Sequence, residues 1–190
     1  MLDLRIDGAT LIDGTGAPAR VAAVGVSGGR VASIGEAGEP ARRSVNATGL
    51  VLCPGFVDLH THYDAQLWWD PAASPSPLHG VTTAIGGNCG FGLAPAGPEH
   101  ADYIMRMMAR VEGMPLTALQ QGLPWDWDGF GDWLGRLDGR IGINAGFLAG
   151  HSTLRRAVLG DETGRPATPP EVERMVALLH DALAAGALGF

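Results

Sequence analysis

The sequence has 190 residues, of which 46% are hydrophobic and 17% charged, and its formal net charge is −7 at pH 7. This balance is typical of a globular chain with a packed core and excludes chain-wide disorder. No cluster of basic residues is larger than the pair Arg42-Arg43, so the sequence offers no basic surface to a phosphate backbone. We therefore expect no nucleic-acid partner. No apolar run reaches the roughly 18 residues of a membrane span. Met1–Asp7 has no basic and apolar leader, so we expect a cytoplasmic protein without a membrane partner.

Residues 1–53 alternate short β-prone runs with glycine turns, which favours antiparallel β structure. No apolar pattern of helical period appears among them. The expected strands are residues 2–6, 9–12, 21–26, 30–34 and 50–53. We therefore predict a small N-terminal β domain of the sandwich type over residues 1–53, and we expect Cys53 at its end to be a core residue.

From residue 54 the rhythm changes to single apolar strands separated by helical stretches, the pattern of βα units that form a parallel sheet. Helices are expected within 98–111 and 125–137, and from Thr168, which forms a capping-box pattern with Glu171. We predict that residues 54–190 form the first βα units of a TIM-like (β/α)8 barrel. Since such a barrel takes about 250 residues, we expect the chain to be truncated. The expected strands are 56–59, 81–85 and 141–148, with the start of another at 187–190.

His60 and His62 stand at the end of the first of these strands. Alternate side chains of a strand point the same way, so the two imidazoles are expected on one side and Thr61 on the other. Two neutral imidazoles one strand repeat apart can share a zinc ion, and the carboxyl end of a barrel strand is where such folds place their chemistry. Taken alone, a His-x-His pair is more often a surface pair or a structurally hydrogen-bonded one.

Three ordered stretches give this pair a context. They are Pro54-Gly55-Phe56-Val57-Asp58-Leu59-His60-Thr61-His62, then His79-Gly80-Val81-Thr82-Thr83 with Gly87-Asn88-Cys89-Gly90, then Gly150-His151-Ser152-Thr153-Leu154-Arg155. One of them resembles the first-strand signature of the amidohydrolase superfamily, and the other two resemble its N-acyl-D-amino-acid deacylase branch. The resemblance runs over nearly the whole chain, and it implies that His60, His62 and Cys89 are metal ligands, with one or two Zn²⁺ ions as the cofactor.

The sequence contains no lysine, whereas many members of the superfamily bridge two metals with a carboxylated lysine. A thiolate can serve instead, because metal coordination deprotonates the thiol. Cys89 is the candidate, and a buried inert thiol is the alternative. The resemblance places that lysine on the fourth strand, further ligands on later strands and the general acid/base aspartate on the eighth. We therefore expect no catalytic residue within these 190 residues.

Four further residues are candidates for binding substrate or supporting the ligands. Asp58 would share the face of the histidines in a regular strand, either as a partner of a ligand or as a buried structural acid. Tyr63 and Asp64 stand on the first loop, where Asp64 either orients a ligand or is solvated. His151, expected at the end of the third strand, has either a pocket role or a structural hydrogen bond.

The resemblance implies a zinc-dependent hydrolase of carbon–nitrogen amide bonds, which deacylates a small-molecule partner, an N-acyl-D-amino acid. Trp68-Trp69 and Trp125-Asp126-Trp127 either wall an acyl pocket or pack in the core. The alternatives are hydrolysis of cyclic amides on the same scaffold and an inactive fragment or interaction module. We expect the 190 residues alone to be inactive. The unpaired strand edges of an unclosed sheet could pair with a second copy of the chain, so the oligomeric state stays open.

Overall fold

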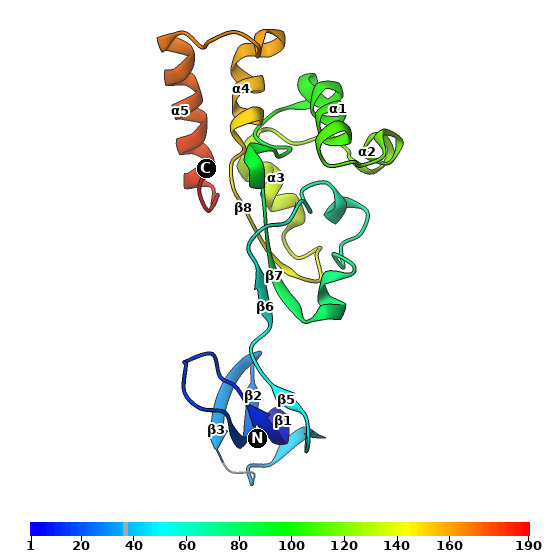
Figure 1. Cartoon of the computed structure of the whole chain (residues 1–190), viewed down its shortest axis with the longest axis vertical. Helices are drawn as coiled ribbons and strands as arrows, with labels where there is room; N and C mark the ends of the chain where they lie inside the picture. Colours follow the sequence, from blue (N-terminus) through cyan, green and yellow to red (C-terminus); the bar gives the residue numbers. More distant parts are fainter. Residues whose placement is uncertain (36–37) are drawn as a thin grey trace. The chain divides into compact units, whose positions relative to one another are not determined.

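A computed structural model of the chain describes residues 1–35 and 38–190. The chain divides into two compact units, Met1–Gly55 and Phe56–Phe190 (Figure 1). The sequence places its change of rhythm at residues 53–54, just before this division. Each unit is built on a sheet of its own.

The described part of the first unit forms one five-stranded sheet. Its strands are β1 (Leu2–Leu11), β2 (Arg20–Ser27), β3 (Arg30–Gly35), β4 (Ala41–Asn46) and β5 (Val51–Leu52). The order is β3-β2-β1-β4, and β5 also pairs with β1. The β1–β2 and β2–β3 pairs are antiparallel, but β1 pairs in parallel with β4 and β5. The expectation of purely antiparallel structure is therefore wrong, because alternation along a strand identifies the strand and not its partner.

Two other features of this unit differ from expectation. β4 was not predicted, because its segment is polar and largely exposed, so no apolar face marks it. Cys53 is exposed and not a core residue. The reason is that pairing with β1 ends where the N–H of Ile12 donates to the carbonyl of Leu52, and Cys53 lies beyond that bond. The core of the unit consists of Leu11, Ala22 and Val24 with Leu52 packed against them.

The second unit is built on a parallel sheet of three strands in the order β6-β7-β8. These strands are β6 (Phe56–Asp58), β7 (Val81–Gly86) and β8 (Asn144–Phe147). Beside β8, the N–H of Leu188 donates to the carbonyl of Phe147, and the N–H of Ala149 donates to the carbonyl of Gly189. The expected segment at 187–190 therefore lies along β8. Parallel strands with helical connections confirm the mixed α/β class that the sequence predicts.

The described α-helices of this unit lie in the connections that follow β7 and β8 (Figure 1). α1 and α3 fall within the expected ranges, and α5 follows the expected cap. α2 and α4 were not predicted, and the seven residues of α2 are too few to show a clear apolar period. None of the described helices is long and apolar enough to cross a membrane. The helices are α1 (Ala101–Val111), α2 (Leu116–Gly122), α3 (Gly129–Leu137), α4 (His151–Leu159) and α5 (Pro169–Ala184).

Tryptophan side chains form much of the core of the second unit. Trp127 and Trp133 are almost fully buried. Nε1 of Trp127 donates to the carbonyl of Ala96 at 3.0 Å, and its ring centroid lies 4.7 Å from that of Trp125 and 5.3 Å from that of Trp68. Contacts of this kind are typical of aromatic core packing. Of the two interpretations open for these tryptophans, packing holds for Trp68, Trp125 and Trp127.

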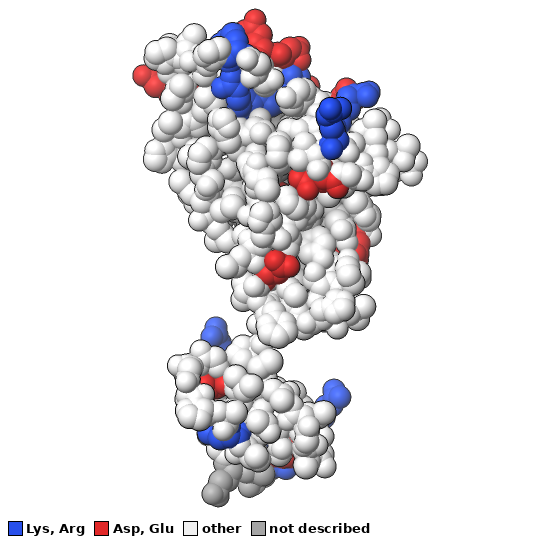
Figure 2. Space-filling view, in the orientation of Figure 1, with Lys and Arg blue, Asp and Glu red and all other residues white. Residues whose placement is uncertain are grey.

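The start of α5 shows the predicted capping box between Thr168 and Glu171. Glu171 also accepts hydrogen bonds from Arg165, and these bonds, together with those from Thr168, hold the pKa of Glu171 well below its usual range. Arg165 and Arg156 pair with acidic residues of the α4–α5 connection. In Figure 2 charged side chains of both signs gather at this end of the second unit.

Candidate metal centre

The loop after β6 carries His60 and His62, and its conformation is fixed through the residue between them. Thr61 is buried, and both its backbone N–H and its hydroxyl donate to the carbonyl of Ile85 on β7, each at 2.9 Å. With Thr61 turned to the sheet, the two imidazoles lie together, their centroids 5.3 Å apart and their planes at 60°. The expected alternation is therefore present, although β6 itself ends at Asp58.

The thiol of Cys89 comes from the turn after β7. Gly87, Cys89 and Gly90 all have positive φ, +77°, +59° and +76°. A left-handed residue other than glycine costs about 1–3 kcal/mol, and such strain gathers at functional sites. Gly87 packs so closely on the end of β8 that a Cβ there would overlap the carbonyl of Leu148. The turn thus has a tightly determined path, and Cys89 is exposed at its tip.

The structure brings His60, His62 and Cys89 together, with one ligand atom from each lying within 4.8 Å of the others. Sγ of Cys89 lies 3.4 Å from Nε2 of His60. Two ligands of one tetrahedral zinc ion lie about 3.6 Å apart, given zinc bond lengths of about 2.0–2.3 Å. Two imidazoles and a thiol are also a donor set that zinc favours. The three side chains therefore fit a zinc ion after shifts of about an ångström.

Asp64 lies beneath the Cys89 turn. It is 2% exposed, and its Oδ2 accepts a hydrogen bond from the backbone N–H of Gly87 at 3.1 Å. A Cβ at Gly86 would lie 2.9 Å from the same oxygen, so the carboxyl group fills the space under the turn. Burial raises the pKa of Asp64 to about 7, and the charge of Glu112 adds to the rise, while the N–H of Gly87 opposes it. Asp64 is thus a buried support of the turn, and the alternative of a solvated carboxylate is wrong.

The other supporting candidates lie in separate surroundings. Oδ1 of Asp58 accepts a hydrogen bond from the backbone N–H of His60 at 3.2 Å. The hydroxyl of Tyr63 shares a hydrogen bond of 2.5 Å with Oγ of Ser76. His151 opens α4, is exposed, and packs its ring edge-on against Phe190 with the centroids 5.9 Å apart. Asp58 and Tyr63 therefore support the histidine loop. His151 is not one of the three converging donors, but it lies against Gly90 in the turn that carries Cys89.

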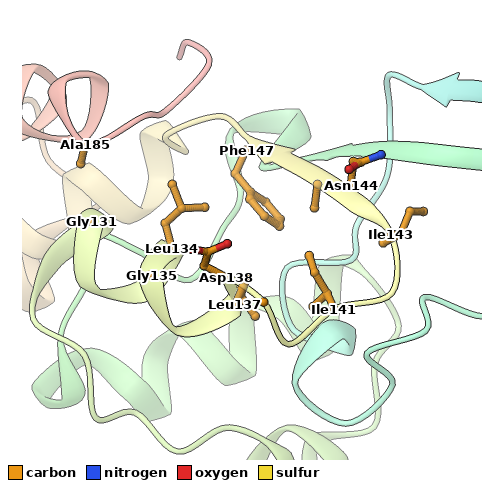
Figure 3. Close-up of a pocket in the computed structure, with 12 residues that line it drawn as sticks. Gly131, Leu134, Gly135, Leu137, Asp138, Ile141, Ile143, Asn144, Phe147 and Ala185 are labelled. Atoms are coloured by element: carbon orange, nitrogen blue, oxygen red, sulfur yellow. The ribbon is translucent and has the colours of Figure 1, made fainter. Parts of the chain in front are cut away.

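A groove of about 600 Å³ opens beside the two histidines. A second groove, of about 570 Å³, lies between α3 and β8, with Asp138 and Asn144 among otherwise apolar and glycine residues (Figure 3). Of these two grooves in the described chain, the histidine groove is the one that adjoins the three converging candidate ligands. Besides the histidines it is lined by Asp58, Thr61, Tyr63, Gln66, Trp69, Glu112, Gly113, Met114 and Pro115.

Glu112 is the residue of this groove that sequence reasoning missed. Its Oε2 lies 3.1 Å from Nδ1 of His62, and its side chain is 9% exposed. The sequence offers one weak signal, an acidic residue directly before Gly113 at a helix end, where basic residues are favoured. The contact itself depends on where α1 ends relative to the histidine loop, which the sequence does not reveal.

The fold and the site together define a mixed α/β protein whose candidate metal ligands follow neighbouring strands of a parallel sheet. The model of the amidohydrolase family matches residues 43–190. This match covers most of the chain, which therefore belongs to the amidohydrolase family.

Individual relatives are consistent with this membership. The chain is 42% identical to N-acyl-D-aspartate deacylase from Alcaligenes xylosoxydans xylosoxydans over 98% of its own length and 36% of that protein's. It superposes with a TM-score of 0.84 and 40% identity on a structure of D-aminoacylase studied for its binuclear metal center, covering 100% of this chain and 38% of that one. The chain also superposes on N-acyl-D-glutamate deacylase from Bordetella bronchiseptica, solved with zinc and a phosphonate inhibitor. The TM-score is 0.78 and the identity 34%, over 100% of this chain and 38% of that one. The chain thus spans little more than a third of the length of these relatives.

Proposed function

We propose that this chain supplies the first βα units and part of the zinc site of an enzyme that hydrolyses the amide bond of N-acyl-D-amino acids. The observation that carries the proposal is the convergence of His60, His62 and Cys89 on the segments that follow two neighbouring parallel strands. Similarity to deacylases named for N-acyl-D-aspartate and N-acyl-D-glutamate supports the class of substrate.

Each of the three candidate ligands has a defined part in this proposal. His60 and His62 bind one or two zinc ions as neutral imidazoles, and Cys89 binds as a thiolate, since coordination removes the thiol proton. Bound zinc would act as a Lewis acid and would lower the pKa of a coordinated water to about 7. Asp58 braces the backbone of His60, and Asp64 supports the turn of Cys89. These two carboxyl groups hold the ligand segments at the spacing that metal binding requires.

The groove beside the histidines is the proposed place of the acyl group. Trp69, Met114 and Pro115 give it an apolar wall, and Trp69 is 41% exposed and therefore open to contact. Apolar walls with a few polar groups are typical of small-molecule sites. The amide carbon would then lie near the metal ligands, with the acyl chain directed along this wall.

The barrel is a further part of the proposal. Phe56, Val57 and Leu59 on and just after the edge strand β6 are 60%, 55% and 70% exposed. Apolar residues at a sheet edge are those that a further strand or a covering segment would bury. We propose that in the complete enzyme the sheet closes into a TIM-like barrel, whose later strands provide the other ligands and the general acid/base aspartate.

Metal binding by this chain is the first test. The chain is freed of metal with a chelator and titrated with cobalt(II), because a cysteine ligand gives a thiolate-to-cobalt charge-transfer band. We expect the band in the unaltered chain and in Cys53→Ser, and its loss in Cys89→Ser. Cys53 is a matched control, since it is the other cysteine and is also exposed. A band that survives in Cys89→Ser would contradict the assignment.

Turnover is tested in a chimera. This chain replaces the matching first 36% of the Alcaligenes N-acyl-D-aspartate deacylase, and release of aspartate from N-acetyl-D-aspartate is measured with added zinc. We expect zinc-dependent turnover that Cys89→Ala and His62→Ala abolish. A cyclic amide and the L-enantiomer are assayed in parallel, and preference for either would favour a different chemistry. A folded, zinc-loaded chimera without turnover would contradict the proposal.

A further inference from the structure

Glu112 occupies a position that helix stability does not favour. It caps the carboxyl end of α1, where its N–H donates to the carbonyl of Met108 at 2.9 Å, and Gly113 then ends the helix with φ of +68°. The carbonyl groups at this end carry partial negative charge, so a carboxylate here is unfavourable by about 0.3–1 kcal/mol, whereas a basic residue would be favourable.

The surroundings of the Glu112 carboxylate add to this cost. Its side chain is 9% exposed, and Oε1 is buried without a hydrogen-bond partner in the described part of the chain. A buried and unpaired carboxylate oxygen is destabilising. The charge of Glu112 also acts on Asp64, another buried acid. Stability therefore gives no reason for an acid at this position, and a contact with the site does.

That contact is with His62. Oε2 of Glu112 lies 3.1 Å from Nδ1 of His62, a separation within the range of an N–H···O hydrogen bond. In a neutral imidazole one ring nitrogen carries the proton and the other has the free lone pair. A carboxylate facing Nδ1 stabilises the proton there, which leaves the lone pair on Nε2.

We propose that Glu112 is a positioning residue, which holds the proton of His62 on Nδ1 and turns Nε2 toward the metal ligands His60 and Cys89. This inference rests on the proposed function, because it assigns Glu112 a purpose only if His62 binds a metal. Histidine ligands commonly donate their second ring N–H to a carboxylate, and loss of such a partner lowers metal affinity by about 10–100-fold.

The tautomer of His62 tests the contact without any metal. The metal-free chain, labelled with ¹⁵N-histidine, is examined by NMR near pH 8, and the His62 signals are assigned by their absence in His62→Gln. We expect Nδ1–H as the dominant tautomer in the unaltered chain and in Glu112→Gln, whose amide oxygen can still accept the bond. We expect Glu112→Leu to shift the population toward Nε2–H. A His62 that is protonated on Nε2 in the unaltered chain would overturn the proposal.

Zinc affinity tests the consequence. Competition with a chromophoric chelator should show a loss of about 10–100-fold in Glu112→Leu and a smaller loss in Glu112→Gln. Glu99→Gln is the matched control, because Glu99 also faces a histidine, His100, at 3.4 Å but lies outside the site. It should bind zinc like the unaltered chain. An unaltered chain that binds no zinc refutes the proposed metal site. Equal zinc affinity with and without Glu112 overturns the role of Glu112 alone.

Discussion

Replacement of Asp64 by asparagine should change how the stability of the second unit depends on pH. Asparagine has nearly the same shape, and its Oδ1 can still accept the hydrogen bond of the Gly87 N–H. It cannot ionise. Burial raises the pKa of Asp64 to about 7 in the native chain, from 3.8 as the ordinary value. Between these two pH values the unfolded chain has lost the proton and the native chain still holds it.

The sign and size of the effect follow from this difference in proton binding. The contribution of Asp64 to stability is greatest below about pH 4, where both states are protonated, and it falls as the pH rises to about 7, where the native acid ionises. Each tenfold change in proton affinity is worth about 1.4 kcal/mol, so ionisation of Asp64 should cost the unaltered chain at most about 4 kcal/mol over this interval. Asp64→Asn should lack that loss and become relatively more stable above pH 7.

Denaturant unfolding of the metal-free chain between about pH 4 and pH 8 measures the effect. Tryptophan fluorescence is the suitable signal, because all five tryptophans lie between residues 68 and 133 and report on the second unit. Asp138→Asn is the control, since Asp138 is exposed at the end of α3. Stability curves of Asp64→Asn and the unaltered chain that run parallel over this range would refute the reasoning.

Three further substitutions have defined outcomes. Gly87→Ala places a Cβ against a neighbouring carbonyl at a position of positive φ, and we expect it to lower the free energy of unfolding by more than about 2 kcal/mol. Gly113→Ala should cost about 1 kcal/mol, because φ is positive there but the space is open. Cys89→Gly relieves the left-handed strain and should be about 1 kcal/mol more stable than Cys89→Ser, while neither gives the cobalt band. Glu171→Gln weakens the pair with Arg165. Because this pair lowers the pKa of Glu171, the substitution should destabilise the chain above about pH 4.5, and the destabilisation should shrink in more acidic solution. Denaturant unfolding measures all three.

Each of these expectations has an outcome that would contradict it. Equal losses in Gly87→Ala and Gly113→Ala would show that the close approach at Gly87 is not limiting. A Cys89→Gly chain no more stable than Cys89→Ser would show that the turn carries no strain. A destabilisation by Glu171→Gln that stays constant from neutral to acidic pH would show that the ionised carboxylate is not what stabilises the start of α5.

Motifs with a local physical cause could be predicted from the sequence. The capping box at Thr168 and Glu171 needs only residues three apart in one helix turn. His60 and His62 lie on the same side of the chain because of strand periodicity, which continues through Thr61, the residue between them that bonds to the neighbouring strand. In these cases every residue that determines the geometry lies within a few positions, so the sequence pattern is sufficient.

Features that depend on distant partners could not be predicted. The pairing of β1 with β4 and β5 is decided by how the chain returns to the sheet, which the polar segment Ala41–Asn46 does not signal. The burial of Asp64 depends on the path of the Cys89 turn above it, and the approach of Glu112 to His62 depends on the length of α1. A loop aspartate and a helix-end glutamate are ordinarily solvated, so their residue types point away from the roles they have here.

Three costs to stability meet at the candidate site, and their coincidence argues for function independently of any relative. Cys89 is held in a left-handed conformation, Asp64 is a buried acid, and Glu112 places a carboxylate at the wrong end of a helix with one oxygen unpaired. Each costs on the order of 1 kcal/mol or more, and such costs persist where the surrounding structure and a function maintain them. All three side chains support or contain the atoms that converge with His60 and His62. A chain selected for stability alone would disperse or remove these costs, and here they surround the proposed metal position.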